Sequence, residues 1–159
     1  IRESGMIDLS QFVLEKDKSV IGLFADSVVT DHDGNLFDAC SYASVAAIIT
    51  SKIPKWEMKD DKPVLIENQE SDAPITTIPI SVTIGRIGEF IIVDPNIDEW
   101  GCLDARITIT TNSDGNIVAL QKGGSDGFTL EQLVKCSELS ITIGKKIREI
   151  VKQATEGGK

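Results

Sequence analysis

The chain has 159 residues, a length that allows one ordinary domain or two small ones. Apolar residues make up 41% of it, which is enough for a core and excludes a wholly disordered chain. Sixteen Lys and Arg against 25 Asp and Glu give a net charge of -9. This charge disfavours nucleic-acid binding through an extended basic surface. A local binding patch remains compatible with this charge.

The cysteines indicate a reduced protein. Cys40, Cys102 and Cys136 are odd in number, widely spaced and without a CxxC pair, so neither a disulfide framework nor a structural zinc site is predicted.

No apolar run approaches the roughly 20 residues that cross a bilayer, and no charged-then-apolar leader opens the chain. We therefore expect a soluble, cytoplasmic protein that binds no membrane.

The first half of the chain predicts a strand, a helix and a connection. Residues 19–30 are rich in β-branched side chains and run into the turn sequence DHDGN, which favours a strand. The alanine-rich segment that follows predicts a buried helix of about fourteen residues with Asp38 as its N-cap. The charged stretch 57–72 reads as a solvated connection and a domain boundary, although residues 64–66 could add a short strand.

The second half predicts two hairpins and a long helix. Residues 80–93 alternate apolar and polar around a turn at 85–88, and residues 106–122 do so around NSDG. In the second hairpin we expect Ile107, Ile109, Ile117 and Ala119 to face a core. Between the hairpins, residues 96–105 predict a loop or a helical turn.

A capping-box pattern starts the last helix at Thr129. Apolar or small side chains then recur every three or four positions: Leu133, Cys136, Ser140, Ile143, Ile147 and Ile150. This spacing predicts one buried face that docks on the sheet, so the fold class is α+β.

Residues that could carry chemistry are few. His32, the single histidine, lies between two aspartates, and an exposed turn residue is favoured over a metal site of Asp31, His32 and Asp33 or a catalytic triad. The glycine-rich segment 121–129 precedes a helix but lacks the P-loop and GxGxxG patterns, so a flexible connection is favoured over a phosphate cradle.

Four carboxylates surround the loop between the hairpins, namely Asp94, Asp98, Glu99 and Asp104. Their residue type suits a divalent ion or acid-base work, but exposed carboxylates are the more ordinary interpretation in an acidic protein. No metal and no cofactor is predicted.

Several segments together resemble the RNase PH superfamily, and within it the non-catalytic ring subunits of the archaeal exosome. The segments are IRESGMIDL, DHDGNLFDACSYASVAA, VDPN with LDARITI, and DGNIVALQKGG before a terminal helix. The resemblance implies an RNase PH-like fold of mixed sheets with packed helices: a portion like domain 2 of ribosomal protein S5 over residues 1–68, then the second RNase PH domain over residues 69–159. It also implies that a further N-terminal stretch of roughly 100 residues, the size of a small domain, belongs to such subunits.

The resemblance implies an active site that has lost its catalytic groups. Active members hold the attacking phosphate with a Thr-Arg pair that opens the helix near Asp38, and carry two carboxylates in the loop after the VD motif. Matched to that pattern, Ser41 and Tyr42 take the Thr and Arg positions, and Trp100 and Arg106 take those of the acids. Without these groups little would orient phosphate or stabilise charge, so we expect a catalytically silent subunit.

The implied role is a supporting one. Three pairs of such a subunit and a catalytic RNase PH-like partner would close a hexameric ring that degrades single-stranded RNA from the 3′ end with phosphate, beneath RNA-binding cap proteins. Arg2, in the IRES motif, is the expected contact with RNA, and an exposed arginine without a role is the alternative. Two other functions stay open: a phosphorolytic 3′-exoribonuclease active by itself, and an inactive, purely structural ring subunit of the eukaryotic type.

Overall fold

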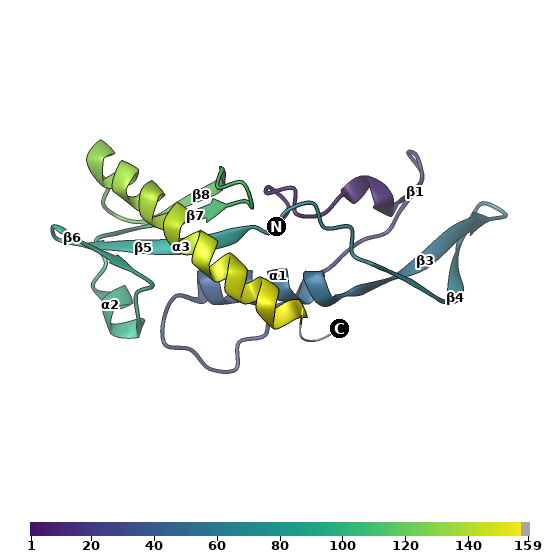
Figure 1. Cartoon of the computed structure of the whole chain (residues 1–159), viewed down its shortest axis with the longest axis horizontal. Helices are drawn as coiled ribbons and strands as arrows, with labels where there is room; N and C mark the ends of the chain where they lie inside the picture. Colours follow the sequence, from purple (N-terminus) through teal and green to yellow (C-terminus); the bar gives the residue numbers. More distant parts are fainter. Residues whose placement is uncertain (157–159) are drawn as a thin grey trace.

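A four-stranded antiparallel sheet forms the centre of the molecule (Figure 1). The computed structural model describes residues 1–156. Strand β5 (Ile80–Ile87) lies between β6 (Phe90–Val93) and β7 (Ala105–Thr111), and β8 (Ile117–Gly124) forms the far edge. Both predicted hairpins are confirmed, β5 with β6 and β7 with β8.

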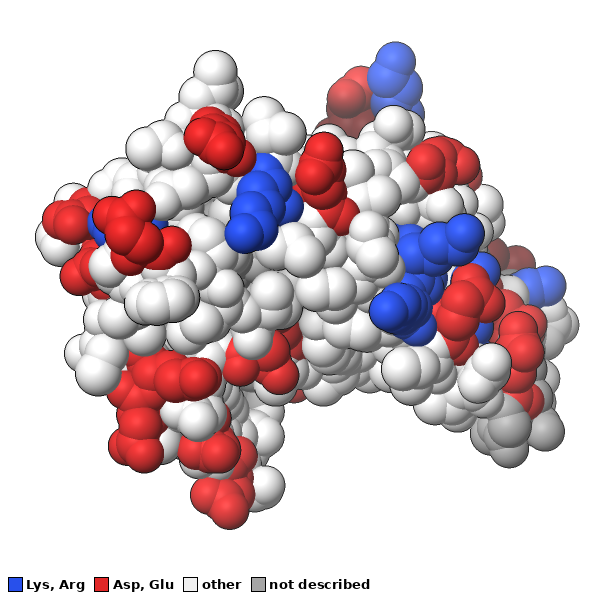
Figure 2. Space-filling model, turned by 60° about the vertical axis from the view of Figure 1, so that its left-hand side comes forward, with Lys and Arg blue, Asp and Glu red and all other residues white. Residues whose placement is uncertain are grey.

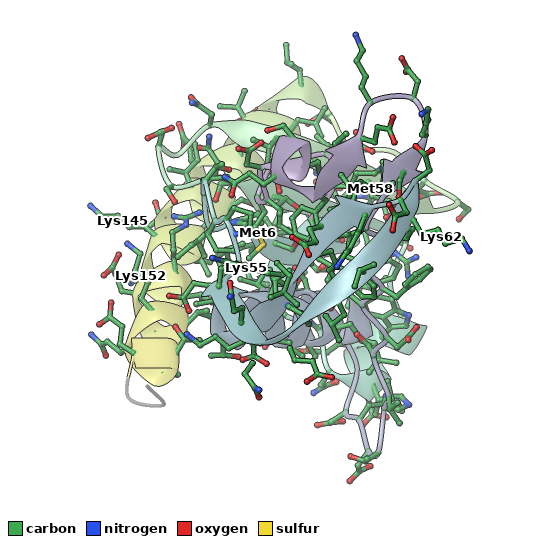
Figure 3. All side chains as sticks on the ribbon, turned by 90° about the vertical axis from the view of Figure 1, so that its right-hand side faces the viewer. Met6, Lys55, Met58, Lys62, Lys145 and Lys152 are labelled. Carbon is green, nitrogen blue, oxygen red and sulfur yellow. The ribbon has the colours of Figure 1, made fainter. Side chains whose placement is uncertain are left out.

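The N-terminal part is built from small elements. A single 3-10 turn (Leu9–Phe12) leads into β1 (Val13–Glu15), which pairs with β2 (Ser19–Val20). Strands β3 (Lys52–Lys59) and β4 (Lys62–Asp72) form a separate hairpin that projects from the body (Figure 1). Met6 is fully buried in the core behind these elements (Figure 3).

The central sheet has one apolar and one polar face, because side chains alternate along each strand. The apolar face packs on helix α3 (Leu130–Glu156) and the polar face lies under helix α1 (Leu36–Thr50). The buried apolar residues of this sheet are Ile80, Val82, Ile84, Ala105, Ile107 and Ile109. The polar residues between them are Ser81, Thr83, Thr108 and Thr110.

Helix α3 is confirmed together with its cap. The Thr129 hydroxyl accepts from the Gln132 amide while the Gln132 side chain accepts from the Thr129 amide, so two backbone donors at the helix start are satisfied. Cys136 and Ser140 are fully buried against the sheet, as predicted. The prediction that Ile150 lies on that face is wrong. Ile150 is 63% exposed, because Arg148 and Val151 occupy the buried positions of this turn.

Arg148 fastens α3 to the sheet from inside. Its side chain is buried, and its Nε donates to the Ile78 carbonyl at 2.7 Å. Its Nη2 donates to the carbonyl and hydroxyl of Thr111 at 2.7 and 3.1 Å. A buried guanidinium is tolerated because these oxygens replace the water that it lost.

Helix α1 begins earlier than the sequence predicted. It starts at Leu36, and the residue before it is Asn35, whose backbone is left-handed and whose side chain makes no capping bond. Asp38 is therefore not the N-cap. It lies in the first turn, and its carboxylate is drawn to the sheet by the donors of Thr83.

Two other expectations for the first half are wrong. Of the strand predicted over 19–30, only β2 forms, since a strand needs a paired neighbour and β1 matches just its start. The segment 57–72, expected as a solvated connection with a short strand at 64–66 as the alternative, is mostly β-hairpin, and residues 64–66 do lie in a strand, β4. Asp60 and Asp61 make its two-residue turn with φ of 51° and 60°, the left-handed geometry that suits a tight hairpin.

In the second half, the first turn is confined to Gly88 and Glu89, and the helical turn between the hairpins is α2 (Ile97–Gly101). Ile117 was expected in the core and is 44% exposed, because it starts the edge strand beyond the reach of α3. Ala119 is half-buried. The division of the chain at residue 68, which lies inside β4, stays a prediction.

Arg148→Met should lower the free energy of unfolding by about 2–3 kcal/mol, because the buried carbonyl of Thr111 and the part-buried carbonyl of Ile78 lose a charged donor. Lys145→Met, at an exposed position of the same helix whose side chain points outward in Figure 3, should change it by less than about 0.5 kcal/mol. Urea unfolding followed by circular dichroism measures both. Equal losses in the two variants would show that Arg148 does not fasten the helix.

Candidate functional site

A buried carboxylate lies between α1 and the sheet. Asp38 is 4% exposed. Its Oδ2 accepts from the backbone amide of Thr83 at 2.7 Å, and its Oδ1 accepts from the Thr83 hydroxyl at 2.9 Å. The Thr83 hydroxyl in turn lies 2.8 Å from that of Thr108 on the next strand. Asp38 thus bonds the first turn of α1 directly to β5, and the Thr83 hydroxyl connects it onward to β7.

Asn35 extends this network to a second carboxylate. Its side-chain nitrogen donates to Asp38 at 2.9 Å and to Asp94 at 2.6 Å. The backbones of Asn35 and Asp94 are both left-handed, with φ of 34° and 56°, conformations that Asn and Asp tolerate better than other residues. The contact therefore holds the loop before α1 against the loop after β6.

One helical turn further along, Ser41 and Tyr42 also face the sheet. The Tyr42 hydroxyl donates to the Ser81 carbonyl at 2.7 Å. The Ser41 and Ser81 hydroxyls lie 3.1 Å apart, and Ser81 also meets the Thr110 hydroxyl at 2.9 Å. Both predicted positions are therefore occupied by neutral side chains bonded to the protein itself.

Burial governs the ionisation of this region. Loss of solvent raises the pKa of Asp38 above its ordinary value of 3.8, while the hydrogen bonds from Asn35 and Thr83 oppose that rise. The pKa of Tyr42 is raised strongly, first by burial and then by the negative charges of Asp38 and Asp94. Tyr42 is therefore a neutral hydrogen-bond donor and offers no positive charge to an anion.

A stack of aromatic rings and a guanidinium forms the second half of the site. The Phe37 and Trp100 rings are stacked with centroids 6.2 Å apart and an interplanar angle of 18°. The Arg106 guanidinium carbon lies 4.8 Å from the Phe37 centroid and 4.6 Å from that of Trp100, a geometry that favours cation-π attraction. The stack joins α1, α2 and β7.

Glycine makes room for this stack. Arg106 pairs across the sheet with Gly85 on one side and Gly123 on the other. A Cβ at Gly123 would lie 2.5 Å from Nε of Arg106, closer than two such atoms can approach. Glycine at residue 123 therefore leaves free the space that the Arg106 guanidinium occupies.

The structure brings some of the predicted positions together and leaves others apart. Trp100 and Arg106 are in contact, but the residue of α1 that meets them is Phe37, not Ser41 or Tyr42. Arg2 lies elsewhere, on the N-terminal segment. Its side chain is 86% exposed and pairs with its neighbour Glu3 at 2.9 Å.

The other sequence candidates have separate local roles. Asp104 accepts from the backbone amide of Gly88 and pairs with Arg86, and Glu99 completes the capping box of α2 with Asn96. His32 is exposed. Within residues 1–156, no three His, Cys, Asp or Glu side chains gather closely enough to hold a metal ion.

Acidic side chains gather in several groups on the side that Figure 2 brings forward, and basic ones form smaller groups between them. None of the helices in the described part of the chain has the length and hydrophobicity needed to span a bilayer.

Sequence reasoning missed Phe37 and Asn35. A signal for Asn35 was present, because an Asn after a Gly directly before a helix often takes the left-handed conformation. Phe37 carried no such signal. Its role depends on Trp100 and Arg106, which lie more than sixty positions away in the sequence.

Asp38→Asn should become relatively more stable than the unchanged chain as pH rises. The pKa of Asp38 is raised in the folded state. The stabilisation of the fold by the protonated carboxyl group is therefore fully present below pH 3.8, the pKa in the unfolded chain, and is lost as pH rises through the pKa of the folded chain. The difference in unfolding free energy, unchanged chain minus variant, should therefore fall between pH 3.8 and neutrality. Asp98→Asn, at an exposed carboxylate of α2, makes the same change in net charge outside the network and is the control. A difference that grows with pH would contradict this account.

Comparisons with known proteins agree with the fold. Residues 77–143 match the model of the 3′ exoribonuclease family, domain 2. The chain is 41% identical over 155 residues to the exosome complex component Rrp42 of Thermococcus gammatolerans, and 38% identical over 152 residues to that of Methanopyrus kandleri. These matches cover 97% and 96% of this chain but 57% of each relative, so the chain spans little more than half of their length.

Solved structures give the same result. An archaeal exosome core chain superimposes with a TM-score of 0.77 at 31% identity, covering 96% of this chain and 59% of the other. A chain of the Archaeoglobus fulgidus exosome with RNA bound to the active site gives 0.76 at 32% identity, covering 94% and 56%. Its sequence matches and its structure show that the chain has an RNase PH-like fold, with residues 77–143 similar to domain 2 of the 3′ exoribonuclease family.

Proposed function

We propose that this chain is part of a non-catalytic subunit of an archaeal exosome ring. In this role it structures the active site of a catalytic RNase PH-like partner, helps to bind single-stranded RNA, and leaves phosphorolysis from the 3′ end to the partner. Cap proteins that bind RNA belong to the same proposal. The observation that carries it is the residue type at three positions: Tyr42 stands where the resemblance expects the phosphate-binding cation, and Trp100 and Arg106 stand where it expects the two acids.

The start of α1 is unfavourable for phosphate. A helix N-terminus attracts anions through its free amides, but the first turn here already holds the Asp38 carboxylate, and Asn35 links a second carboxylate, Asp94, to it. At the position expected for a cation, Tyr42 offers only a neutral hydroxyl that is bonded to Ser81. A phosphate dianion placed in this first turn would meet the negative charge of Asp38, and Tyr42 would offer it no positive charge.

The acid positions are equally unsuited. Trp100 has no carboxylate, and the side chain of Arg106 is a cation whose nitrogens are hydrogen-bond donors without an acceptor. Neither side chain can therefore give a proton to the leaving 3′ oxygen or hold a metal ion beside it. Both are instead engaged with each other through their stacked planes.

The relatives support the assembly. Those described above are named exosome complex components, and one of the similar structures is an exosome with RNA bound to its active site. The chain also leaves large apolar side chains uncovered, among them Phe24 at 88% and Val28 at 87% exposure. Exposed apolar side chains of this size favour contact with further protein.

The purified protein should release no nucleoside diphosphate from single-stranded RNA in phosphate buffer. Mixed with its catalytic RNase PH-like partner, it should raise the rate above that of the partner alone, because a completed ring orients phosphate and RNA together. Chromatography of the released diphosphates measures both. Release by the protein alone would identify it as an independent exoribonuclease, and an unchanged rate in the mixture would contradict the supporting role.

Arg2→Ala should weaken the binding of single-stranded RNA by the complex by about five-fold, as expected for loss of one phosphate contact, and should weaken it less at high salt. Lys16→Ala, at another exposed position of the N-terminal segment, removes the same charge and is the control. Fluorescence anisotropy of a labelled oligonucleotide at two salt concentrations makes the comparison. Equal effects of the two substitutions would show that Arg2 contributes only general charge.

A further inference from the structure

The Arg106 guanidinium has no acceptor of its own. Among residues 1–156 it neither donates a hydrogen bond nor forms an ion pair, although the chain carries 25 acidic residues. The acids close to it in the fold or sequence are already engaged: Asp104 with Arg86 and Gly88, and Asp94 with Asn35. A half-buried guanidinium carries five N–H donors, so its polar edge must be satisfied from outside the chain.

The guanidinium is also held in a fixed plane. Phe37 and Trp100 contact its face, and the bare backbone of Gly123 lies beside Nε. A planar fork that is oriented in advance loses little conformational freedom when it binds, and its geometry suits two oxygens of one oxyanion.

The rings beside it distinguish between the possible ligands. Phe37 is 38% exposed although it belongs to a stack. The carboxylate of a neighbouring protein would use the guanidinium and leave this ring in water. A nucleotide would use both, because its base can stack on an aromatic ring while its phosphodiester oxygens accept from arginine.

We propose that Phe37, Trp100 and Arg106 form a stacking platform for one nucleotide of single-stranded RNA, with Arg106 donating to its phosphodiester. This inference rests on the RNA-binding part of the proposed function and adds a contact separate from Arg2. The platform lies where the resemblance places a lost catalytic site, so that site has kept affinity for the strand without its chemistry. Free phosphate is a poor ligand there, since the carboxylates of Asp38 and Asp94 lie in the adjoining network.

Binding to the platform can be followed through Trp100. The chain has two tryptophans, and Trp56→Phe leaves Trp100 as the single indole that reports. In this background, titration with a ten-nucleotide oligoadenylate should quench the emission saturably, because a base stacks on the aromatic group. Arg106→Gln should weaken binding about ten-fold, in the range found for removal of a stacking or charged contact.

Two further variants separate position from charge. Gly123→Ala leaves every charge in place but forces the guanidinium aside, and should weaken binding to a similar extent. Lys122→Gln removes a positive charge from the neighbouring residue of β8, whose side chain alternates to the other face, and should weaken it less than about two-fold. Circular dichroism of each variant verifies that the fold is kept.

Inorganic phosphate and acetate serve as competitors in the same titration. The platform is supported if neither anion restores the quenched Trp100 emission at concentrations well above those at which the oligonucleotide saturates the quenching. It is overturned if Arg106→Gln and Gly123→Ala bind RNA as tightly as the background chain, or if acetate competes as well as RNA, which would indicate a protein carboxylate as the natural ligand. These readouts contain no diphosphate release, so failure of the platform is distinguishable from failure of the non-catalytic role.

Discussion

The contact between the Asp38 carboxylate and Thr83 is the constraint on which the site depends. A carboxylate that is 4% exposed is costly unless donors surround it, and here Thr83 supplies two and Asn35 a third. Those donors are available in one orientation of α1, with its first turn over the middle strand. The same orientation brings Phe37, the residue before Asp38, to the rings and guanidinium at the edge of the site.

The parts of the fold that the sequence predicted are those in which burial follows a simple period. Apolar and polar residues alternate along the strands, with Val82, Ile84 and Ile109 facing α3. Helix α3 has buried side chains every three or four positions that pack on this face. The polar face obeys the same alternation, and periodicity alone would assign Ser81 and Thr83 on it to solvent. Their burial depends on hydroxyl pairing with α1 and β7, which hydrophobic periodicity does not encode.

For the site, the sequence predicted the kinds of residue better than their partners. The resemblance singled out Trp100 and Arg106, and the structure places them in one stack. It could not identify Phe37, since that contact requires α1 to start at Leu36, two residues before the expected cap. The shift arises from the left-handed backbone of Asn35, whose side chain donates both to nearby Asp38 and to Asp94, which is distant in the sequence.

Arg148 and Arg106 are each held in place by groups other than carboxylates. Arg148 is enclosed by carbonyl oxygens and Arg106 by aromatic planes, while the surplus of acids keeps the net charge at -9. In such a chain, diffuse attraction for RNA is absent, and any affinity must come from cations fixed at particular places. Fixed, desolvated contacts weaken less with salt than a basic surface does, and they bind a strand in one register. A subunit that positions RNA for a partner needs that property more than it needs tight binding.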